Sequence, residues 1–423
     1  METAQIFAVA IFLLVMAVII SEKLHRATVA LAGGVIMILT GIISFEEGVE
    51  AIDFNTLGIL LGMMLFVAVV KESGLFEYMA IKAAKAAKGD PWKIMALFMV
   101  ITAVFSAFLD NVTTVLLVGP MTISICRMIK TNPVPFLITQ ILASNIGGTA
   151  TLIGDPPNIM IGSAAKFSFL DFVLMDAPAV VIIMIVTILM FRFIYGRKLT
   201  VSDEDRAEIM KLKEKNSIRD EVLFKKSMIM IVLVVLAFMF HDVIGLESSE
   251  VALAAGIIMI LIGKVDFEEA MHSVEWSTML FFIGLFMVVG AMEATGVITL
   301  FADFIMDITH GNIIVMMLVI LWVSALLSAI LDNIPFVATM IPLVLAMEHS
   351  GVDVTPLWWA ISLGACLGGN GTLIGASANV VLSGIANKNG YPITFVQFMK
   401  IGMPVMLVSI VISTVYLLVR FGL

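Results

Sequence analysis

Charged residues are scarce in this sequence, and their scarcity excludes a soluble protein. Lys, Arg, Asp and Glu make up 13% of the 423 residues, whereas apolar residues make up 61% and the mean hydropathy is +1.11. Soluble domains carry about a quarter charged residues and about half apolar ones. The chain has too little polar surface to stay dissolved, and we predict an integral membrane protein.

Cysteines and N-terminal basic residues are also lacking. The two cysteines, Cys126 and Cys366, lie in separate apolar stretches, which excludes a cysteine motif for metal binding. We interpret both as small buried apolar residues. The N-terminal apolar run has no basic residue before it and no small-residue cleavage site, so it predicts a retained helix. The net charge of −9 does not indicate a nucleic-acid partner.

Apolar stretches long enough to cross about 30 Å of hydrocarbon recur along the whole chain. They cover residues 4–20, 27–43, 54–71, 134–165, 172–195, 227–241, 250–263, 275–292, 356–387 and 394–420. Two more apolar stretches, 94–126 and 313–347, are interrupted at the middle by Asp-Asn and predict re-entrant hairpins. The polar segment 197–226 predicts a linker between two halves.

The two halves contain the same pattern. Val29–Thr56 aligns with Val251–Thr278, and half of the aligned positions are identical. At the same offset of 222 residues Asp110-Asn111 falls on Asp332-Asn333, and at an offset of 221 residues Gly147–Asn158 falls on Gly368–Asn379. Apolar composition alone would not produce this agreement, so the chain contains an internal duplication.

Basic residues give the orientation, because Lys and Arg concentrate in cytoplasmic loops. Segment 71–93 contains several lysines, whereas its counterpart 293–315 contains no Lys or Arg. With the N-terminus outside, only Lys166 and Arg420 of all the basic residues fall outside. We therefore predict an all-α polytopic protein of the plasma membrane with both termini outside and linker 197–226 cytoplasmic. Its two inverted repeats, 1–196 and 227–423, each have five transmembrane helices, one re-entrant hairpin and a helix broken at the membrane midplane.

Asp110 and Asp332 are the leading candidate functional residues, because each lies at the middle of an apolar hairpin. A carboxylate at membrane depth is costly and is tolerated only where it faces protein or a water-filled cavity. Each would also cap the second arm of its hairpin, a structural role that is compatible with ion binding. Neutral oxygens suited to sodium accompany the carboxylates, on Asn111, Thr113, Thr114 and Asn333. We predict a sodium site at Asp110, Asn111, Asp332 and Asn333.

A second group of candidates lies where glycine and proline interrupt the stretches 134–165 and 356–387. Broken backbone at membrane depth is tolerated where it lines a cavity, and the ends of a broken helix attract ions. The alternative is a proline kink without a ligand. The candidates are Asn145, Gly147, Gly148, Thr149, Thr151, Asp155 and Asn158 in the first break and Gly368, Gly369, Asn370, Thr372 and Asn379 in the second. Asp155 aligns with Ala376, so we predict that it matters less than the hairpin pair.

Fixed positive charge is absent from the stretches that hold these candidates. No Lys or Arg occurs between Lys93 and Arg127 or between Lys264 and Lys388. We therefore expect a core with fixed negative charge only. Such a core favours a cation, a proton or a neutral species over a free polyanion such as citrate, which its carboxylates would repel.

Four motifs resemble the ion transporter superfamily: FLDNVTTVLL, SNIGGTATLIGDPPN, AILDNIPFVATMIPL and GACLGGNGTLIGASANVV. The resemblance covers the whole chain and is to the branch of citrate-transporter-like domains that holds arsenite permeases, sodium/proton antiporters and the melanosomal P protein, nearest the P protein. It implies a homodimer in which a transport domain moves against a scaffold as an elevator. Related dicarboxylate transporters have Ser-Asn-Thr at the hairpin tips, where this sequence has Asp110-Asn111 and Asp332-Asn333.

These observations predict an ion-coupled secondary transporter that exchanges a cation, Na⁺, for protons. Two carboxylates at one small cavity disfavour double ionisation, so a proton and a sodium ion would compete for one site. The alternatives are a proton-coupled permease for arsenite or another small anion, and a passive channel. An aspartyl protease would need Gly-x-Gly-Asp and Tyr-Asp motifs, which the sequence lacks. The expected partners are a small inorganic ion, membrane lipid and a second copy of the chain, with no cofactor besides bound Na⁺.

Overall fold

The computed structural model describes residues 3–21, 23–196 and 198–422, and this part of the chain is helical, without a β-strand. The first half contains α1 (Thr3–Ile20), α2 (Arg26–Leu39), α3 (Phe45–Glu50), α4 (Phe54–Glu72), α5 (Leu75–Ala86), α6 (Pro91–Phe108), α7 (Asn111–Met128), α8 (Val134–Gly148), α9 (Pro156–Ala165), α10 (Phe169–Met175) and α11 (Ala177–Tyr195). The segment between the halves contains α12 (Asp203–Lys211) and a 3₁₀ turn, η1 (Glu214–Ser217).

The second half contains α13 (Glu221–Phe240), α14 (Ser248–Gly263), α15 (Phe267–His272), α16 (Trp276–Ala294), α17 (Val297–Ile308), α18 (Ile313–Ser328), α19 (Asn333–His349), α20 (Thr355–Gly368), α21 (Ser377–Lys388), α22 (Phe395–Leu417) and a final π-helical turn, η2 (Leu418–Gly422). The prediction of an all-α fold is confirmed. Within the described residues, eight helices are long and apolar enough to cross a membrane, or up to ten if two bent helix pairs each count as one span.

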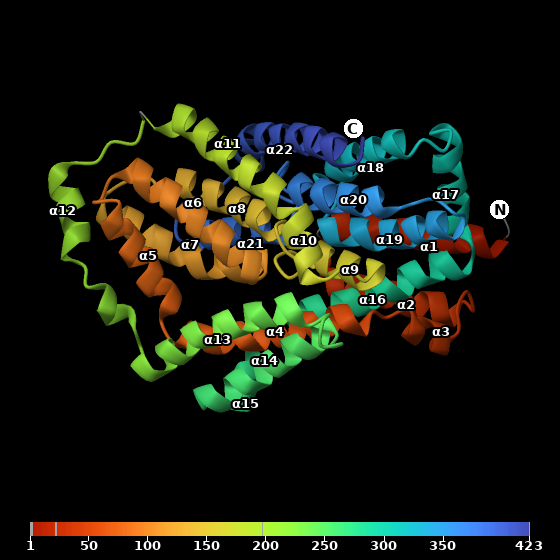
Figure 1. The fold of residues 1–423 in the computed structure, drawn as a ribbon, viewed down its shortest axis with the longest axis horizontal. Helices are drawn as coiled ribbons and strands as arrows, with labels where there is room; N and C mark the ends of the chain where they lie inside the picture. Colours follow the sequence, from red (N-terminus) through yellow and green to blue (C-terminus); the bar gives the residue numbers. More distant parts are fainter. Residues whose placement is uncertain (1–2, 22, 197, 423) are drawn as a thin grey trace.

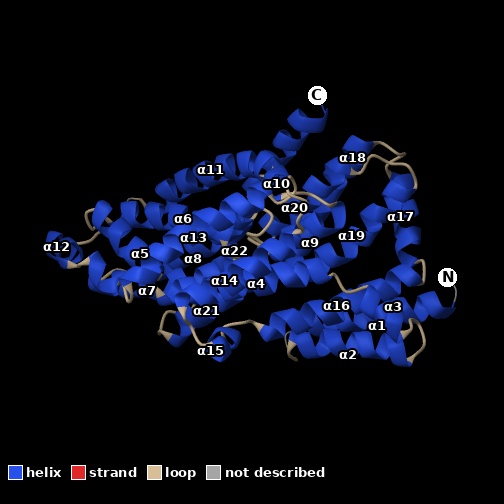
Figure 2. Cartoon of the chain, turned by 60° about the horizontal axis from the view of Figure 1, so that its bottom comes forward, coloured by secondary structure: helices blue, strands red, loops and turns tan. Residues whose placement is uncertain are grey.

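The helices of the two halves pack into two groups. The scaffold group contains α1 to α4 and α13 to α16; within it α2 packs along α16 and α4 along α14. The hairpin group contains α6 to α11 and α18 to α22; within it α6 packs on α8, α18 on α20 and α7 on α21. In Figure 1, α4, α13 and α14 lie along the lower side, and α6, α11 and α22 along the upper side. The turned view in Figure 2 again separates α1, α2 and α16 from α11 and α18.

The contacts of one half repeat those of the other. The pair α2–α16 is the counterpart of α14–α4, and the pair α7–α21 is the counterpart of α19–α9. The match extends to single residues: a Cβ on Gly62 would lie 2.4 Å from the Ala252 carbonyl oxygen, and one on Gly284 would lie 2.7 Å from that of Ala30. Membrane helices approach closely at small residues. Two equivalent glycine–alanine crossings therefore hold the scaffold group together.

We expect Gly62→Ala to lower the melting temperature of the detergent-solubilised protein, because the added methyl group meets backbone atoms of α14. Overpacking of this kind costs about 1–3 kcal/mol. Gly384→Ala is the matched control, since a Cβ at this helical position of α21 meets nothing within 4 Å. Equal melting temperatures for the two variants would show that the crossing does not need the glycine.

Equivalent elements of the two halves lie at opposite ends of the long axis. In Figure 1, α5 and α12 are at one end, whereas α17, the counterpart of α5, is at the other end with α3. Lysines gather at the α5 end, where α5 carries Lys82 and Lys85. This is the arrangement that an inverted repeat requires, because equivalent parts must face opposite sides.

The segment between the halves is held to the α5 end by ion pairs. Lys85 Nζ lies 2.6 Å from Glu214 Oε2, and Lys130 Nζ lies 2.8 Å from Asp205 Oδ1. The hydrogen bond from Lys130 lowers the pKa of the Asp205 carboxyl. Helix α13 begins at Glu221, inside the linker expected over 197–226, because the Asp220 side chain caps it by accepting from the Val222 and Leu223 amides. Residues 1–2, 197 and 423, which belong to the expected termini and linker, lie outside the described residues.

Candidate functional site

Each Asp-Asn tip begins the second arm of its hairpin, as the capping prediction requires. Asp110 caps α7 and accepts from the Thr113 amide at 2.8 Å and the Thr113 hydroxyl at 2.5 Å. Asp332 caps α19 and accepts from the Ile334 amide at 3.1 Å. The counterpart of Thr113 in the duplication is Pro335, which has neither an N–H nor a hydroxyl to donate. Asp332 is therefore left with fewer local donors than Asp110.

The two breaks separate α8 from α9 over residues 149–155 and α20 from α21 over residues 369–376. Two asparagines hold the broken backbone in place. Asn158 donates to the carbonyls of Thr149 and Thr151 at 3.1 and 3.0 Å, and Asn379 donates to those of Gly369 and Thr372 at 2.7 and 2.9 Å. The Thr151 and Thr372 hydroxyls donate in turn to carbonyls at the ends of the first hairpin arms, those of Ala107 and Ala329. These four side chains thus shape the breaks.

The glycines expected in the breaks provide close packing. Helix α8 ends at Gly148 and helix α20 ends at Gly368, so the glycine pairs stand directly at the start of the breaks. A Cβ on Gly147 would lie 2.2 Å from the Ala103 carbonyl oxygen, and one on Gly368 would lie 2.6 Å from that of Ala325. They let α6 and α18 approach α8 and α20 closely. A Cβ on Gly148 would lie 2.5 Å from the Gly154 carbonyl oxygen, and one on Gly369 would lie 3.0 Å from the Gly375 carbonyl oxygen.

A buried asparagine network joins the two halves. Asn145 donates to the side-chain oxygens of Asn370 and Asn379 at 3.0 and 2.9 Å, and it accepts from Asn111 Nδ2 at 3.3 Å. Its counterpart in the duplication is Cys366, whose Sγ lies 3.4 Å from Asn158 Oδ1. Cys366 is buried, as interpreted from the sequence, and its thiol also contacts this network. Its alignment with Asn145 is the sequence signal for that contact.

A cavity of about 20 Å³ lies between both hairpin tips, the first break and the scaffold group. Three carboxyl groups line it, from Asp110, Asp155 and Glu275, together with the Arg26 side chain and the amides of Asn111 and Asn333. Asn333 Nδ2 lies 3.3 and 3.4 Å from the two carboxyl oxygens of Asp155, which is fully buried. A volume of this size holds one water molecule or one small ion. The structure thus brings the first hairpin, the first break and the second hairpin together at one point.

Glu275 is a residue of this cavity that sequence reasoning missed. It directly precedes α16 in the scaffold group, and its Oε2 accepts from the Thr278 hydroxyl at 3.0 Å. Its counterpart Asp53 makes the same contact with Thr56, at 2.5 Å. An acid three residues before a threonine, repeated at the start of equivalent helices, is the sequence signal. Charges at helix ends are common in membrane proteins, so this pattern alone does not mark a site.

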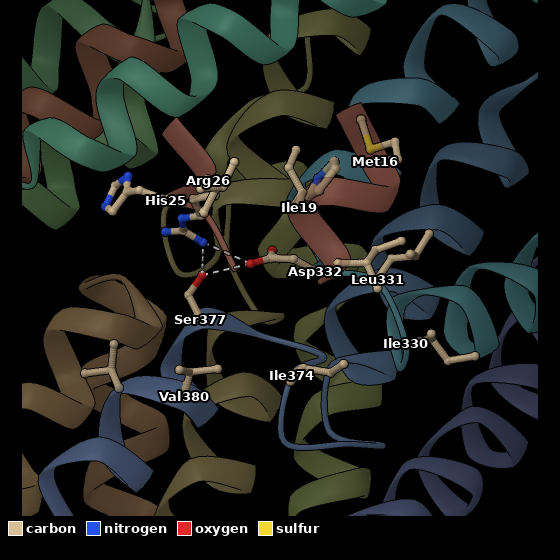
Figure 3. A pocket seen from close by; sticks show the side chains of 14 residues that line it. Met16, Ile19, His25, Arg26, Ile330, Leu331, Asp332, Ile374, Ser377 and Val380 are labelled. Atoms are coloured by element: carbon tan, nitrogen blue, oxygen red, sulfur yellow. Dashed lines mark hydrogen bonds and ion pairs between the residues drawn. The ribbon is translucent and has the colours of Figure 1, made fainter. Parts of the chain in front are cut away.

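Arg26 shows that the core also contains fixed positive charge, contrary to the expectation from the sequence. Its Nη1 lies 3.0 Å from Asp332 Oδ2 and 2.6 Å from Ser377 Oγ (Figure 3). Its Nη2 lies 3.3 Å from Thr278 Oγ1. Asp332 lines a neighbouring cavity of about 280 Å³, and Arg26 and Ser377 line both cavities. A shared ion site of Asp110 and Asp332 stays a prediction. Arg26 is the first residue of α2, and lysines and arginines at helix ends ordinarily face water. Its position in the sequence therefore does not indicate this contact.

The remaining candidates lie close to these groups. The Thr149 hydroxyl donates to the Asn145 carbonyl at 2.8 Å, and the buried Thr114 hydroxyl has no partner within the described part of the chain. No three His, Cys, Asp or Glu side chains in that part converge as a metal site. A sodium ion here would therefore also use neutral amide, hydroxyl or backbone oxygens, which hard cations accept.

Comparison with known sequences shows the family of this chain. A profile of the citrate transporter (CitMHS) family matches residues 16–364. The chain belongs to this family. Its expected place in the ion transporter superfamily is thereby confirmed, and the protein is a multi-pass membrane transporter of an ion or small solute.

Several relatives of this citrate transporter family member extend over nearly the whole chain. A protein named as an uncharacterized transporter of Mycobacterium tuberculosis is 43% identical over 424 residues, 99% of both chains. The human P protein is 34% identical over an alignment that covers 99% of this chain and 60% of the P protein. The crystal structure of the YdaH transporter of Alcanivorax borkumensis matches 100% of this chain and 99% of its own with a TM-score of 0.63 at 15% identity. This last likeness shows the shared fold alone.

Proposed function

We propose that this family member exchanges sodium ions for protons at the cavity of about 20 Å³. The observation that carries the proposal is the set of groups that line it: three carboxyl groups and two asparagine amides, against the single positive charge of Arg26, around a space for one small ion. These groups come from the first hairpin tip, the first break, the second hairpin tip and the scaffold group. An ion held there touches both helix groups.

Competition for one cavity supports exchange. Three carboxyl groups this close disfavour full ionisation, so bound protons lower their mutual repulsion. A sodium ion would do the same and would exclude the protons. Binding of either ion at one site, followed by exposure to the other side, gives antiport without a separate site for each ion.

The arrangement of the two helix groups supports alternating access by an elevator movement. All residues of the hairpin tips and breaks belong to the hairpin group, whereas Glu275 and Arg26 belong to the scaffold group. We propose that the hairpin group moves against the scaffold group. We also propose that the two halves are inverted repeats in the plasma membrane, with linker 197–226 on the cytoplasmic side, and that the protein is a homodimer. The last point rests on the family resemblance alone.

A second candidate function is proton-coupled transport of a small anion such as arsenite. The cavity of about 280 Å³ beside Arg26 favours it, because a guanidinium there can bind an anion. Citrate, for which the family is named, fits this site less well. Its three carboxylates would meet Asp110, Asp155, Asp332 and Glu275 against the single positive charge of Arg26.

Sodium affinity measured across pH 5.5–8.5 on purified protein tests the proposal. We expect the parent to bind sodium more tightly as the pH rises, because fewer protons compete for the cavity. Asp110→Asn removes one competing charge and should weaken sodium binding and flatten its pH dependence. Asp332→Asn should change the pH dependence less, because Arg26 already neutralises Asp332.

A parent protein that binds no sodium, or whose sodium affinity is the same at every pH, contradicts the antiport proposal. Uptake of arsenite into proteoliposomes under an imposed proton gradient would then support the second candidate. Sodium, proton and arsenite gradients should each be imposed singly, so that the coupled ion is identified directly.

A further inference from the structure

The duplication is broken at one charged position of the site. Continuing the alignment to the start of α2 and α14 places Arg26 on Ser248, whose hydroxyl lies 3.3 Å from His241 Nε2. The same alignment places Ser377 on Pro156 and Pro335 on Thr113. Arg26 and Ser377 at the second hairpin tip thus align with Ser248 and Pro156 of the other half. The second tip also lacks the amide and hydroxyl donors that Thr113 provides at the first. Asp332 and Asp110 are equivalent in position but have different counter-charges.

Several contacts fix the Arg26 side chain beside Asp332. Besides its contacts with Asp332, Ser377 and Thr278, its Cζ lies 5.0 Å from the centre of the Phe281 ring. Ser377 Oγ also lies 3.0 Å from Asp332 Oδ2, so the three groups close a triangle (Figure 3). The Arg26 side chain is 29% exposed and that of Asp332 is 15% exposed, so water screens the pair only partly. Asp332 is therefore neutralised without an added ion.

This ion pair joins the two helix groups. Arg26 and Thr278 belong to the scaffold group, whereas Asp332 and Ser377 belong to the hairpin group. A relative movement of the groups would separate them. An arginine is always charged and cannot dissociate from its helix, so it remains on the scaffold when the hairpin group leaves.

The equivalent corner in the other half makes different contacts. The α1–α2 corner with Arg26 meets the second hairpin tip and break. Its counterpart, the α13–α14 corner with His241 and Ser248, faces a cavity of about 480 Å³ at the far end of α9, lined by Ser163 and Lys166. The structure therefore corresponds to one of two arrangements. In the opposite arrangement the α13–α14 corner would contact the first hairpin tip, and the α1–α2 corner would leave the second. The uncharged Ser248 would then lie at Asp110, and Asp332 would be released from Arg26.

We propose that Arg26 is a tethered cation that takes the place of a sodium ion at Asp332 in the arrangement seen here and leaves that carboxylate to the ion in the opposite arrangement. The inference rests on the proposed sodium transport and adds to it a reason for ion release at one end of the transporter. Guanidinium and sodium compete for the same carboxyl oxygens, so Asp332 binds one or the other. At the equivalent position of the other half, Ser248 has no charge and does not compete with sodium.

Sodium binding by the purified full-length protein at one fixed pH tests the role of Arg26. Arg26→Ser, which installs the residue of the other half, should bind sodium about tenfold more tightly or better, since close charge pairs of this kind contribute measurably to affinity. Arg26→Lys keeps the charge but loses the forked geometry, and it should give a smaller gain. Arg127→Ser is the control, because Arg127 contacts Asn389 and the Tyr391 ring and lines neither cavity. Adding Asp332→Asn to Arg26→Ser should abolish the gain.

Two results separate this inference from the proposed function. If the parent binds sodium and Arg26→Ser binds it with equal or lower affinity while remaining folded, Arg26 does not compete with sodium and the inference is wrong. If Arg26→Ser does not fold, the same comparison between the parent and Arg26→Lys decides, and equal affinity refutes the competition. If neither the parent nor any arginine variant binds sodium, the proposed function and the inference fail together.

Discussion

Asp155→Asn is expected to lower the rate of sodium–proton exchange in proteoliposomes by about 100-fold or more. Removing a charged partner from a buried site costs about 3–5 kcal/mol, which corresponds to at least this factor. Asp155 is fully buried, lines the cavity together with Asp110 and Glu275, and accepts from Asn333 of the other half. The asparagine keeps the size of the side chain and removes its charge, so the fold should survive while the ion loses a ligand.

Asp176→Asn is the matched control. Asp176 is also a fully buried carboxyl group of the hairpin group, and its Oδ2 lies 2.5 Å from the Ser362 hydroxyl, but it lines neither of the two cavities at the tips. We expect this variant to transport at a rate close to that of the parent. A similar loss in both variants would indicate a general effect of removing buried carboxyl groups, and near-normal transport by Asp155→Asn would remove Asp155 from the ion site.

The geometry favours a different order of importance from the one that the sequence suggests. In the sequence Asp155 has no acidic counterpart, since it aligns with Ala376, and it therefore ranks below Asp110 and Asp332. In the structure Asp332 is paired with Arg26, whereas Asp155 faces the cavity with Asn333 as its donor. The symmetry between the repeats indicates the shared positions, Asp110 and Asp332. The proposed coupling of two ions at one site depends instead on positions where the repeats differ, such as Asp155 and Arg26.

Local patterns predicted the fold better than they predicted the site. An Asp-Asn at the middle of an apolar stretch marks the hairpin tips at Asp110 and Asp332, because a carboxylate there caps the following helix. Glycine and proline mark the region of the breaks for a similarly local reason. Arg26 could not be found in this way, because it contacts Asp332, 306 positions away along the chain. Glu275 and Cys366 differ from Arg26, since each has a signal in the sequence: an acid repeated three residues before a threonine, and an alignment with Asn145.

Joining Asn55 to Ser163 through introduced cysteines is expected to abolish transport. Asn55 belongs to α4 of the scaffold group, and its Nδ2 lies 3.2 Å from Ser163 Oγ on α9 of the hairpin group. Ser163 Oγ also lies 2.9 Å from Asp53 Oδ1, so this contact is one of the places where the two groups touch. If transport requires the groups to move past each other, a short reducible bridge between positions 55 and 163 fixes one arrangement. Transport should fall to the level of empty liposomes and return when the bridge is reduced.

Three comparisons make this experiment decisive. Asn55→Cys and Ser163→Cys alone, treated with the same bifunctional thiol reagent, should transport normally, and the native Cys126 and Cys366 are buried. A bridge between Trp322→Cys and Thr414→Cys lies inside the hairpin group, where Trp322 Nε1 is 3.1 Å from Thr414 Oγ1, and it should leave transport intact. Full transport by protein that is completely bridged between positions 55 and 163 would contradict the elevator movement. A passive channel would then become the better explanation, because ions would cross without relative movement of α4 and α9.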